Sequence, residues 1–343
     1  MLMLKKIHYL LFLCLLSSYV LAQEGKTIAG EECDLHYRIW GEGKPVLYIN
    51  GGPGFSSLGS EIYAKMLSES RQVILYDQRG TGQSTCNQID RSTIATGKML
   101  EDIELLRKTL NVERWDIIGH SFGATLAVLY ANEYPERLHH LVLSAPVRIN
   151  LSRDRSYIPV FNSKLTEKER NDINILLKDY NSLRGSGQLT PAQEVAFYRG
   201  IDSLRAGAYI YNRENLPKIR KWFLERSEKN RTVNSLVWRN LEWEFPLRYD
   251  FSKEPDSTGQ RPLLHSTKGI ELRENLRQIP NKVLIIIGEH DCFSLYAAKD
   301  YHELFLNSEL NIIAESGHSM TTDAPKIYWE AIRQLLEEEC VDC

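Results

Sequence analysis

Gly119-His120-Ser121-Phe122-Gly123 is the stretch that decides the fold. It follows Trp115-Asp116-Ile117-Ile118, which predicts a short buried strand, and it precedes an apolar run of good helix formers at 124–131. A serine flanked by glycines between a strand and a helix is typical of a nucleophile elbow. Such a turn strains the serine backbone and exposes the hydroxyl at the carboxyl end of the strand.

Further strands and helices are predicted on both sides of this turn. An alternating pattern at 34–40 indicates a half-buried strand, and continuous apolar runs indicate buried strands at 46–49, 73–76, 141–145, 283–288 and 310–313. Helical spacing occupies 98–110 and 325–338. Alternating strands and helices predict an α/β fold, with a mostly parallel sheet covered on both faces by helices.

The segment from 148 to 266 differs from the rest of the chain. It contains no buried-strand run, is rich in charge and carries Trp222, Trp238 and Trp243. Thr166 and Thr190 are placed as helix N-caps. We therefore expect an α/β core in two parts, 23–147 and 267–343, with an inserted helical cap at 148–266 over the carboxyl end of the sheet.

The N-terminus has the pattern of a secretory signal peptide. Lys5 and Lys6 precede the apolar run 10–16, and the small residue Ala22 lies where cleavage is expected. The apolar run is too short to span a bilayer comfortably. We expect removal of 1–22, a periplasmic or secreted protein and no stable membrane anchor afterwards.

The net charge and the cysteine content bear on the binding partners and the disulfides to be expected. A net charge of −3 gives no electrostatic reason to expect nucleic acid as a partner. Five cysteines remain after the signal peptide, so one of them is unpaired. The pairs we expect are Cys340 with Cys343 or Cys33 with Cys86, and Cys292 is the expected free thiol.

Three chemically active residues occur in the order Ser121, Asp291, His318. Each follows a predicted parallel strand, so all three are expected at one edge of the sheet. His318 would accept the proton of Ser121 and return it to the leaving group, and Asp291 would orient the imidazole. Glu289 is the alternative acid.

The loops beside this edge are expected to complete the site. Three glycines within 50–54 let the backbone approach a ligand closely, and the backbone N–H groups of Gly52 and Phe122 are expected to form an oxyanion hole. Asp77 and Arg79 are predicted to form a structural ion pair that shapes the neighbouring loop. No metal and no organic cofactor is implied.

These motifs resemble the proline iminopeptidase family of serine peptidases, a branch of the α/β-hydrolases. Gly51-Gly52-Pro53-Gly54, Asp77-Gln78-Arg79-Gly80, Gly119-x-Ser121-x-Gly123, Gly288-x-x-Asp291 and Gly317-His318 match motifs of that family in order. The resemblance implies removal of an N-terminal residue, often proline, from short peptides. It also implies cap carboxylates that bind the free amino group of the substrate.

The resemblance extends weakly into the cap. Trp238-Arg239-Asn240-Leu241-Glu242 resembles the family pattern Trp-x-x-Trp-Glu, with Leu241 in place of the second tryptophan, and this nominates Glu242 as the amine anchor, with Glu244 as the alternate. Two core positions depart from the family. Asn50 replaces the usual histidine before the glycines, and His120-Ser121-Phe122 replaces the usual Gly-Ser-Trp.

The sequence therefore predicts a secreted serine hydrolase, an aminopeptidase of proline iminopeptidase type acting on small peptides. One alternative is a carboxylic-ester or amide hydrolase with the same triad and some other small-molecule acyl substrate. A further alternative is a non-catalytic binding protein with the hydrolase fold. The order of motifs leaves the oligomeric state open.

Overall fold

The computed structural model describes residues 25–149, 157–224, 228–244, 247–249, 263–265, 267–293 and 295–338. Side chains at 228–230, 242–244, 247–249, 263–265 and 267–270 lie outside that description. The predicted signal peptide at 1–22 and the Cys340–Cys343 pair also lie outside the described residues.

A nine-stranded sheet forms the centre of the described molecule, in the order β1-β2-β4-β3-β6-β7-β10-β11, with β5 paired to β2. From β4 to β11 every neighbouring pair is parallel, whereas β1, β2 and β5 pair antiparallel. The α/β class and the mostly parallel sheet are confirmed. The strands are β1 Lys26–Ile28, β2 Cys33–Trp40, β3 Lys44–Ile49, β4 Arg71–Tyr76, β5 Thr85–Cys86, β6 Trp115–His120, β7 Leu138–Ser144, β10 Lys282–Gly288 and β11 Ser308–Ile313.

The central strands are apolar on both faces because helices cover both faces. In β3, Leu47 and Ile49 join one buried cluster, whereas Val46 and Tyr48 join the other. The first cluster includes side chains of α3 Thr96–Thr109, α4 Phe122–Glu133, α10 Thr267–Arg277 and α11 Tyr296–Leu304. The second includes α2 Glu61–Leu67 and α13 Pro325–Glu337. Burial on both sides explains the continuous apolar runs in the sequence.

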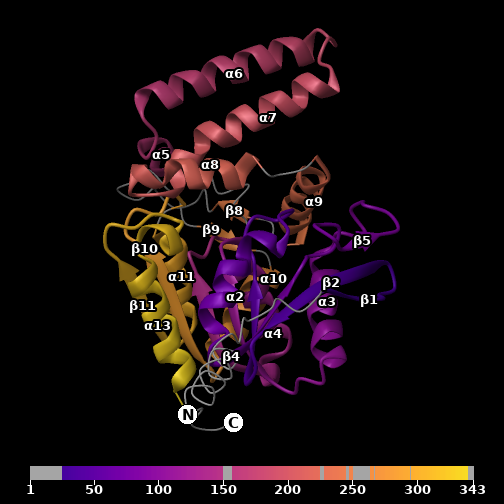
Figure 1. Ribbon diagram of the computed structural model, residues 1–343, viewed down its shortest axis with the longest axis vertical. Coiled ribbons are helices and arrows are strands. Elements are labelled where there is room, and N and C mark those ends of the chain that lie inside the picture. The colour runs from indigo at the N-terminus through magenta and orange to yellow at the C-terminus, as the bar shows by residue number, and fades with distance from the viewer. Residues whose placement is uncertain are drawn as a thin grey trace, which may run out of the picture.

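The cap helices lie beyond the edge of the sheet, with α6 and α7 as an antiparallel pair at the top of the view (Figure 1). Thr166 and Thr190 begin α6 and α7 with complete capping boxes, which confirms both predicted helix starts. The described helices of the cap are α5 Tyr157–Ser163, α6 Glu167–Gly185, α7 Pro191–Arg205, η3 Ala206–Tyr209, η4 Arg213–Asn215, α8 Leu216–Leu224 and α9 Glu228–Glu244.

Some short elements were not predicted. The strands β8 Leu247–Tyr249 and β9 Leu263–His265 form an antiparallel pair within the segment expected to lack strands. Three-residue strands are too short to show periodicity. The short elements η1 Ser57–Ser60, η2 Pro135–Arg137 and α12 Met320–Asp323 also escaped prediction. Among the described helices, none combines the length and hydropathy needed to cross a bilayer.

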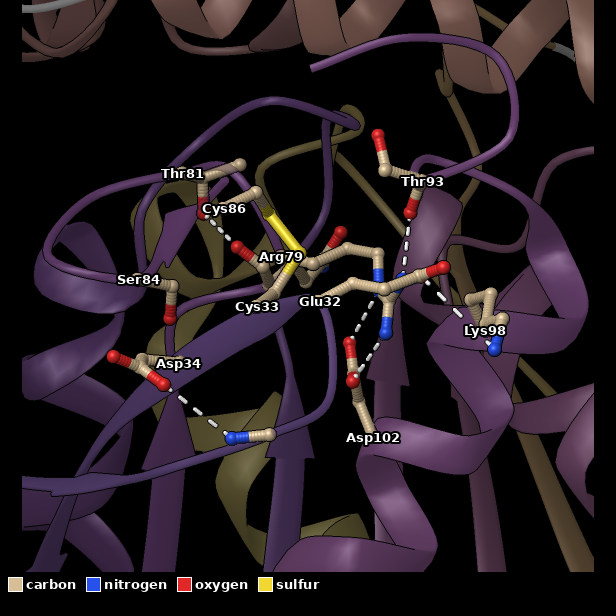
Figure 2. The surroundings of a disulfide bond; sticks show 12 residues. Glu32, Cys33, Asp34, Arg79, Thr81, Ser84, Cys86, Thr93, Lys98 and Asp102 are labelled. Carbon is tan, nitrogen blue, oxygen red and sulfur yellow. Dashed lines mark hydrogen bonds and ion pairs between the residues drawn. A yellow bond between two sulfur atoms is a disulfide. The ribbon is translucent and has the colours of Figure 1, made fainter. Parts of the chain in front are cut away.

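A disulfide joins Cys33 of β2 to Cys86 of β5, where the two residues face each other across the ladder (Figure 2). This confirms one of the two pairs expected from the sequence. Cys292 is the free cysteine of the described residues, and it is buried. Burial raises the pKa of its thiol well above the ordinary value, so the thiol stays protonated.

Candidate active site

The turn between β6 and α4 has the geometry of a nucleophile elbow. Ser121 has φ 55° and ψ −118°, a backbone conformation that L-residues rarely adopt. A Cβ on Gly119 would lie 2.4 Å from the carbonyl oxygen of Gly123, and a Cβ on Gly123 would lie 2.1 Å from that of Ile49. Both glycines are therefore required because α4 packs directly against β6 and β3.

Ser121, His318 and Asp291 form one hydrogen-bonded line. The Oγ of Ser121 lies 2.9 Å from Nε2 of His318, and Nδ1 of His318 lies 2.7 Å from Oδ2 of Asp291. Asp291 and His318 are each 3% exposed. An ordered chain of serine, imidazole and buried carboxylate can move a proton from the hydroxyl to the imidazole.

The loops after β10 and β11 hold this line together. The other carboxylate oxygen of Asp291 accepts a hydrogen bond of 2.7 Å from the backbone N–H of Phe293. His290 N–H donates to the carbonyl of Ser316, which ties the two loops to each other. Glu289, the alternative acid, has a half-exposed side chain. Its Oε2 lies 3.6 Å from Nε2 of His290. The geometry therefore brings Asp291, and not Glu289, to the imidazole.

The glycine loop at 50–54 lies beside Ser121. Gly52 has φ 61°, in the left-handed region that favours glycine, and a Cβ there would collide with the ring of Phe55. The amide of Asn50 donates to the carbonyl oxygens of Gly51 and Phe55, so this residue holds the loop in shape. Gly52, Ser121 and Phe122 line the same cavity, and the oxyanion hole of Gly52 and Phe122 stays a prediction.

The loop after β4 is hydrogen-bonded to the glycine loop and to Ser57, which follows it. Asp77 is buried, and its Oδ1 accepts from both the backbone N–H and the hydroxyl of Ser57, at 2.6 and 2.9 Å. The side chain of Gln78 donates to the carbonyl oxygen of Asn50. These contacts explain why the two motifs occur together in one sequence.

The predicted ion pair between Asp77 and Arg79 is wrong. Arg79 instead donates to both carboxylate oxygens of Asp102, at 2.6 and 2.7 Å, and its third nitrogen donates to the carbonyl of Thr93 (Figure 2). Strand β4 ends at Tyr76 and Arg79 lies in the turn that follows, so Asp77 contacts Ser57 while the Arg79 side chain is directed to α3. Both residues remain structural, as expected.

His120 lies beside the triad but outside it. Its ring centroid is 5.3 Å from that of His318, and its Nδ1 lies 3.1 Å from the hydroxyl oxygen of Ser144. Burial, with a smaller contribution from the nearby His318, lowers the pKa of His120 from 6.5 to about 3. His120 is therefore neutral at pH 7 and adds no charge beside the serine.

A cavity of about 370 Å³ opens over Ser121, between core and cap. The amide of Asn234 in α9 donates to the carbonyl oxygen of Pro53, which fixes the cap to the glycine loop. Eight of the 19 described residues that line it are Phe, Tyr or Trp, so the cavity offers apolar surface to a small group. The aromatic lining residues are Phe55, Phe122, Tyr157, Tyr209, Trp222, Phe223, Trp238 and Phe293.

Asp202 is a lining residue that the sequence analysis did not nominate. It belongs to α7, is 8% exposed and pairs with Arg231 of α9 at 2.7 Å. It is the one carboxylate among the described residues that line the cavity. It is one of four charged residues on an ordinary amphipathic helix, so the sequence gives no reason to single it out. The side chains of Glu242 and Glu244 lie outside the described part of the structure.

The family model for the alpha/beta hydrolase fold matches residues 44–325. The chain therefore belongs to the α/β-hydrolase family. Within it, the predicted resemblance is confirmed by several relatives. A proline iminopeptidase of Heyndrickxia coagulans is 24% identical over 298 residues, covering 86% of this chain and 91% of the relative. One of Lactobacillus acidophilus is 23% identical over 311 residues, covering 89% and 94%.

Higher identity is confined to shorter segments. A proline iminopeptidase of Xylella fastidiosa is 38% identical over 111 residues, or 32% of this chain and 35% of the relative. The aligned segments span 42% of a relative from Mycoplasma genitalium and 31% of one from Leptolyngbya boryana. Among solved structures, the proline iminopeptidase of Mycobacterium smegmatis aligns with a TM-score of 0.63 at 15% identity, covering 91% of this chain and 97% of that one. At this identity the match supports the fold.

Proposed function

We propose that the protein is a serine aminopeptidase of proline iminopeptidase type, which releases an N-terminal residue from short peptides. The observation that carries the proposal is the hydrogen-bonded line from Ser121 through His318 to Asp291 at the mouth of an aromatic cavity. The relatives that align along most of the chain support the peptidase assignment.

The mechanism follows from the positions of these groups. Ser121 attacks the carbonyl carbon of the scissile bond while its proton passes to Nε2 of His318. The negative charge that develops on the carbonyl oxygen is stabilised by the N–H groups of Gly52 and Phe122, close to the N-terminus of α4. His318 then protonates the leaving amine. Water, activated by the same imidazole, hydrolyses the acyl-enzyme and regenerates the serine hydroxyl.

The amine of the substrate needs a carboxylate in the cap. A protonated amino group buried among aromatic rings is costly unless an anion meets it there. Glu242 follows Trp238 by four residues in α9, and this spacing supports Glu242 as the anchor, because residues four apart share a helix face and Trp238 lines the cavity. We assign the amine anchor to Glu242, with Glu244 as the alternate and Asp202 as a second cap carboxylate.

One observation favours the alternative of an ester or amide hydrolase. Asp202 is already paired with Arg231, and Arg205 also lines the cavity. A carboxylate whose charge is offset in this way binds an incoming ammonium group less strongly. If the proposed carboxylate of α9 does not bind the amino group, the cavity accepts neutral acyl groups and does not require a free amine.

The deciding experiment is a panel of aminoacyl arylamides with free and acetylated N-termini, run beside short p-nitrophenyl esters. The aminopeptidase predicts a strong preference for the free amine, and an esterase or amidase predicts none. Labelling by a serine-reactive phosphonate, located by peptide mass spectrometry, is expected at Ser121 alone. Absence of both labelling and turnover would leave the non-catalytic binding protein as the better description.

We also propose that the mature protein is exported and begins after Ala22. The proposal rests on the charged, apolar and small-residue pattern of 1–22 and is supported by the Cys33–Cys86 disulfide, since such bonds persist in oxidising compartments. N-terminal sequencing of protein from the periplasm or medium is expected to begin at Gln23. An intact N-terminus on cytoplasmic protein would contradict export.

A further inference from the structure

A second depression, which we call the arginine groove, adjoins the active-site cavity. It has a volume of about 1070 Å³ and is lined by residues of α6, α7 and α9. It shares four wall residues with the cavity, namely Asp202, Arg205, Asn234 and Trp238. The two hollows therefore border the same residues and are neighbours in the structure.

The groove carries an excess of positive charge. Arg199 and Arg205 line it from α7, and Arg231 and Arg239 line it from α9. The carboxylates that line it are Glu194 and Asp202. The groove is thus positively charged, although the protein as a whole has a net charge of −3.

Both carboxylates are already engaged. Asp202 pairs with Arg231 at 2.7 Å, and Arg231 also lies 4.6 Å from the ring centroid of Tyr198. Glu194 accepts a hydrogen bond from the hydroxyl of Tyr180 at 3.0 Å. By contrast, Arg199, Arg205 and Arg239 are exposed and form no ion pair with any carboxylate whose position the structure describes. Within the part of the structure whose side chains are described, these three guanidinium groups are open to an anionic ligand.

We propose that the arginine groove binds the part of a peptide that follows the scissile bond and selects peptides with carboxylates there. The identity of the occupant rests on the proposed aminopeptidase function. The leaving segment of any such substrate ends in a free carboxylate, and acidic side chains add further charge. The rings of Phe197, Tyr198 and Trp238 supply apolar surface beside the charges. The substrates favoured by this arrangement are short acidic peptides.

Equilibrium binding tests the groove without requiring turnover. The full-length Ser121→Ala variant is titrated calorimetrically with tetrapeptides that share their first two residues and end in Glu-Glu, Gln-Gln or Lys-Lys. We expect the Glu-Glu peptide to bind about tenfold more tightly than the Lys-Lys peptide at low salt, because each surface charge contact contributes modestly. The preference is expected to shrink in about 1 M salt, where the Debye length is about 3 Å.

Substitution in the groove makes the test specific. In the Ser121→Ala background, Arg199→Gln with Arg239→Gln is expected to bring the Glu-Glu to Lys-Lys ratio close to one. Arg184→Gln removes an exposed arginine from the last turn of α6 outside the groove and is expected to leave the ratio unchanged. Because each ratio is taken within one variant, a loss of folded protein cancels. An equal ratio in the parent, or an unchanged ratio in the double variant, overturns the proposal.

The outcome is separable from that of the proposed function. If the groove is wrong, peptides are still cleaved with a free-amine requirement but without preference for acidic leaving segments. If the aminopeptidase assignment is wrong, acetylated and free peptides behave alike, and the Kd ratio of the acidic and basic peptides still reports on the groove.

Discussion

The sheet core and the helical cap differ in how their side chains pack and in what they contribute to the site. In the core, Val46, Leu47, Tyr48 and Ile49 are at most 1% exposed, and the parallel strands other than the edge strand β11 are buried along most of their length. The two buried clusters of the cap are smaller, and charged pairs such as Asp202–Arg231 lie between its helices. A rigid core suits reacting groups, which tolerate little displacement, whereas the cap varies the shape and charge of the cavity.

This contrast has a functional consequence. Changes to triad residues, which belong to core loops, are expected to lower turnover of every substrate by a similar factor. Changes to cap residues are expected to lower the turnover of some substrates much more than that of others. Substitutions at single residues test that division.

Ser121→Ala removes the proposed nucleophile. We expect kcat to fall by roughly 10⁴–10⁶ for arylamides and esters alike, because both require the same acyl-enzyme. The measurement is steady-state kinetics on both substrate classes, with circular dichroism as the check on folding. Loss confined to one substrate class would show that Ser121 does not act on both.

Asp291→Asn keeps the geometry but favours the wrong tautomer of His318. A loss of about 10⁴ in kcat is expected by analogy with other triads. Glu289→Gln is the matched control, since this neighbouring acid lies on the same loop with a half-exposed side chain and is expected to cost far less. The reverse ranking would transfer the role of the acid to Glu289.

The disulfide is expected to stabilise the core. Cys33 and Cys86 are 53 residues apart, so the loop-closure model predicts a loss of about 4 kcal/mol in the free energy of unfolding for Cys33→Ala with Cys86→Ala. Denaturant unfolding measures it. Reductant is expected to lower the Tm of the wild type but to leave that of the double variant unchanged. A wild-type Tm indifferent to reductant contradicts the prediction.

His120 is expected to make stability depend on pH. Its pKa is about 3 in the folded protein against 6.5 as the ordinary value, so between these values the unfolded chain binds the extra proton. Stability is therefore lost as pH falls below 6.5, by about 1–2 kcal/mol at pH 5. His120→Asn is expected to flatten the dependence of Tm on pH, and the exposed His302→Asn is expected not to. Equal slopes in all three proteins would show that His120 is not the cause.

The core was more predictable than the cap for a physical reason. Ser121, Asp291 and His318 each follow a parallel strand, and the carboxyl ends of parallel strands meet at one edge, so chain order alone brings them together. The same reasoning failed for Arg79 because its partner Asp102 lies on a helix 23 residues away, and a strand pattern does not specify which helix faces a loop.

In the cap no comparable rule connects sequence to site. Helix starts at Thr166 and Thr190 were visible because capping is local. Which charged residue of α7 enters the cavity depends on how α7 packs against α9, and that packing involves contacts between residues far apart in the chain. Asp202 and Arg205 therefore became apparent only from the structure.

The most direct test separates recognition of the substrate's amino group by the cap from hydrolysis by the triad. Wild type, Glu242→Gln and Glu167→Gln, an exposed cap glutamate as the control, are compared on one arylamide with a free amine, the same arylamide acetylated, and a small p-nitrophenyl ester. We expect Glu242→Gln to lose about 2–4 kcal/mol of transition-state binding in kcat/KM for the free amine alone, and acetylation to cost the wild type a similar amount. Equal hydrolysis of free and acetylated arylamides by the wild type would contradict the account, because a cap that does not distinguish them does not bind an amine.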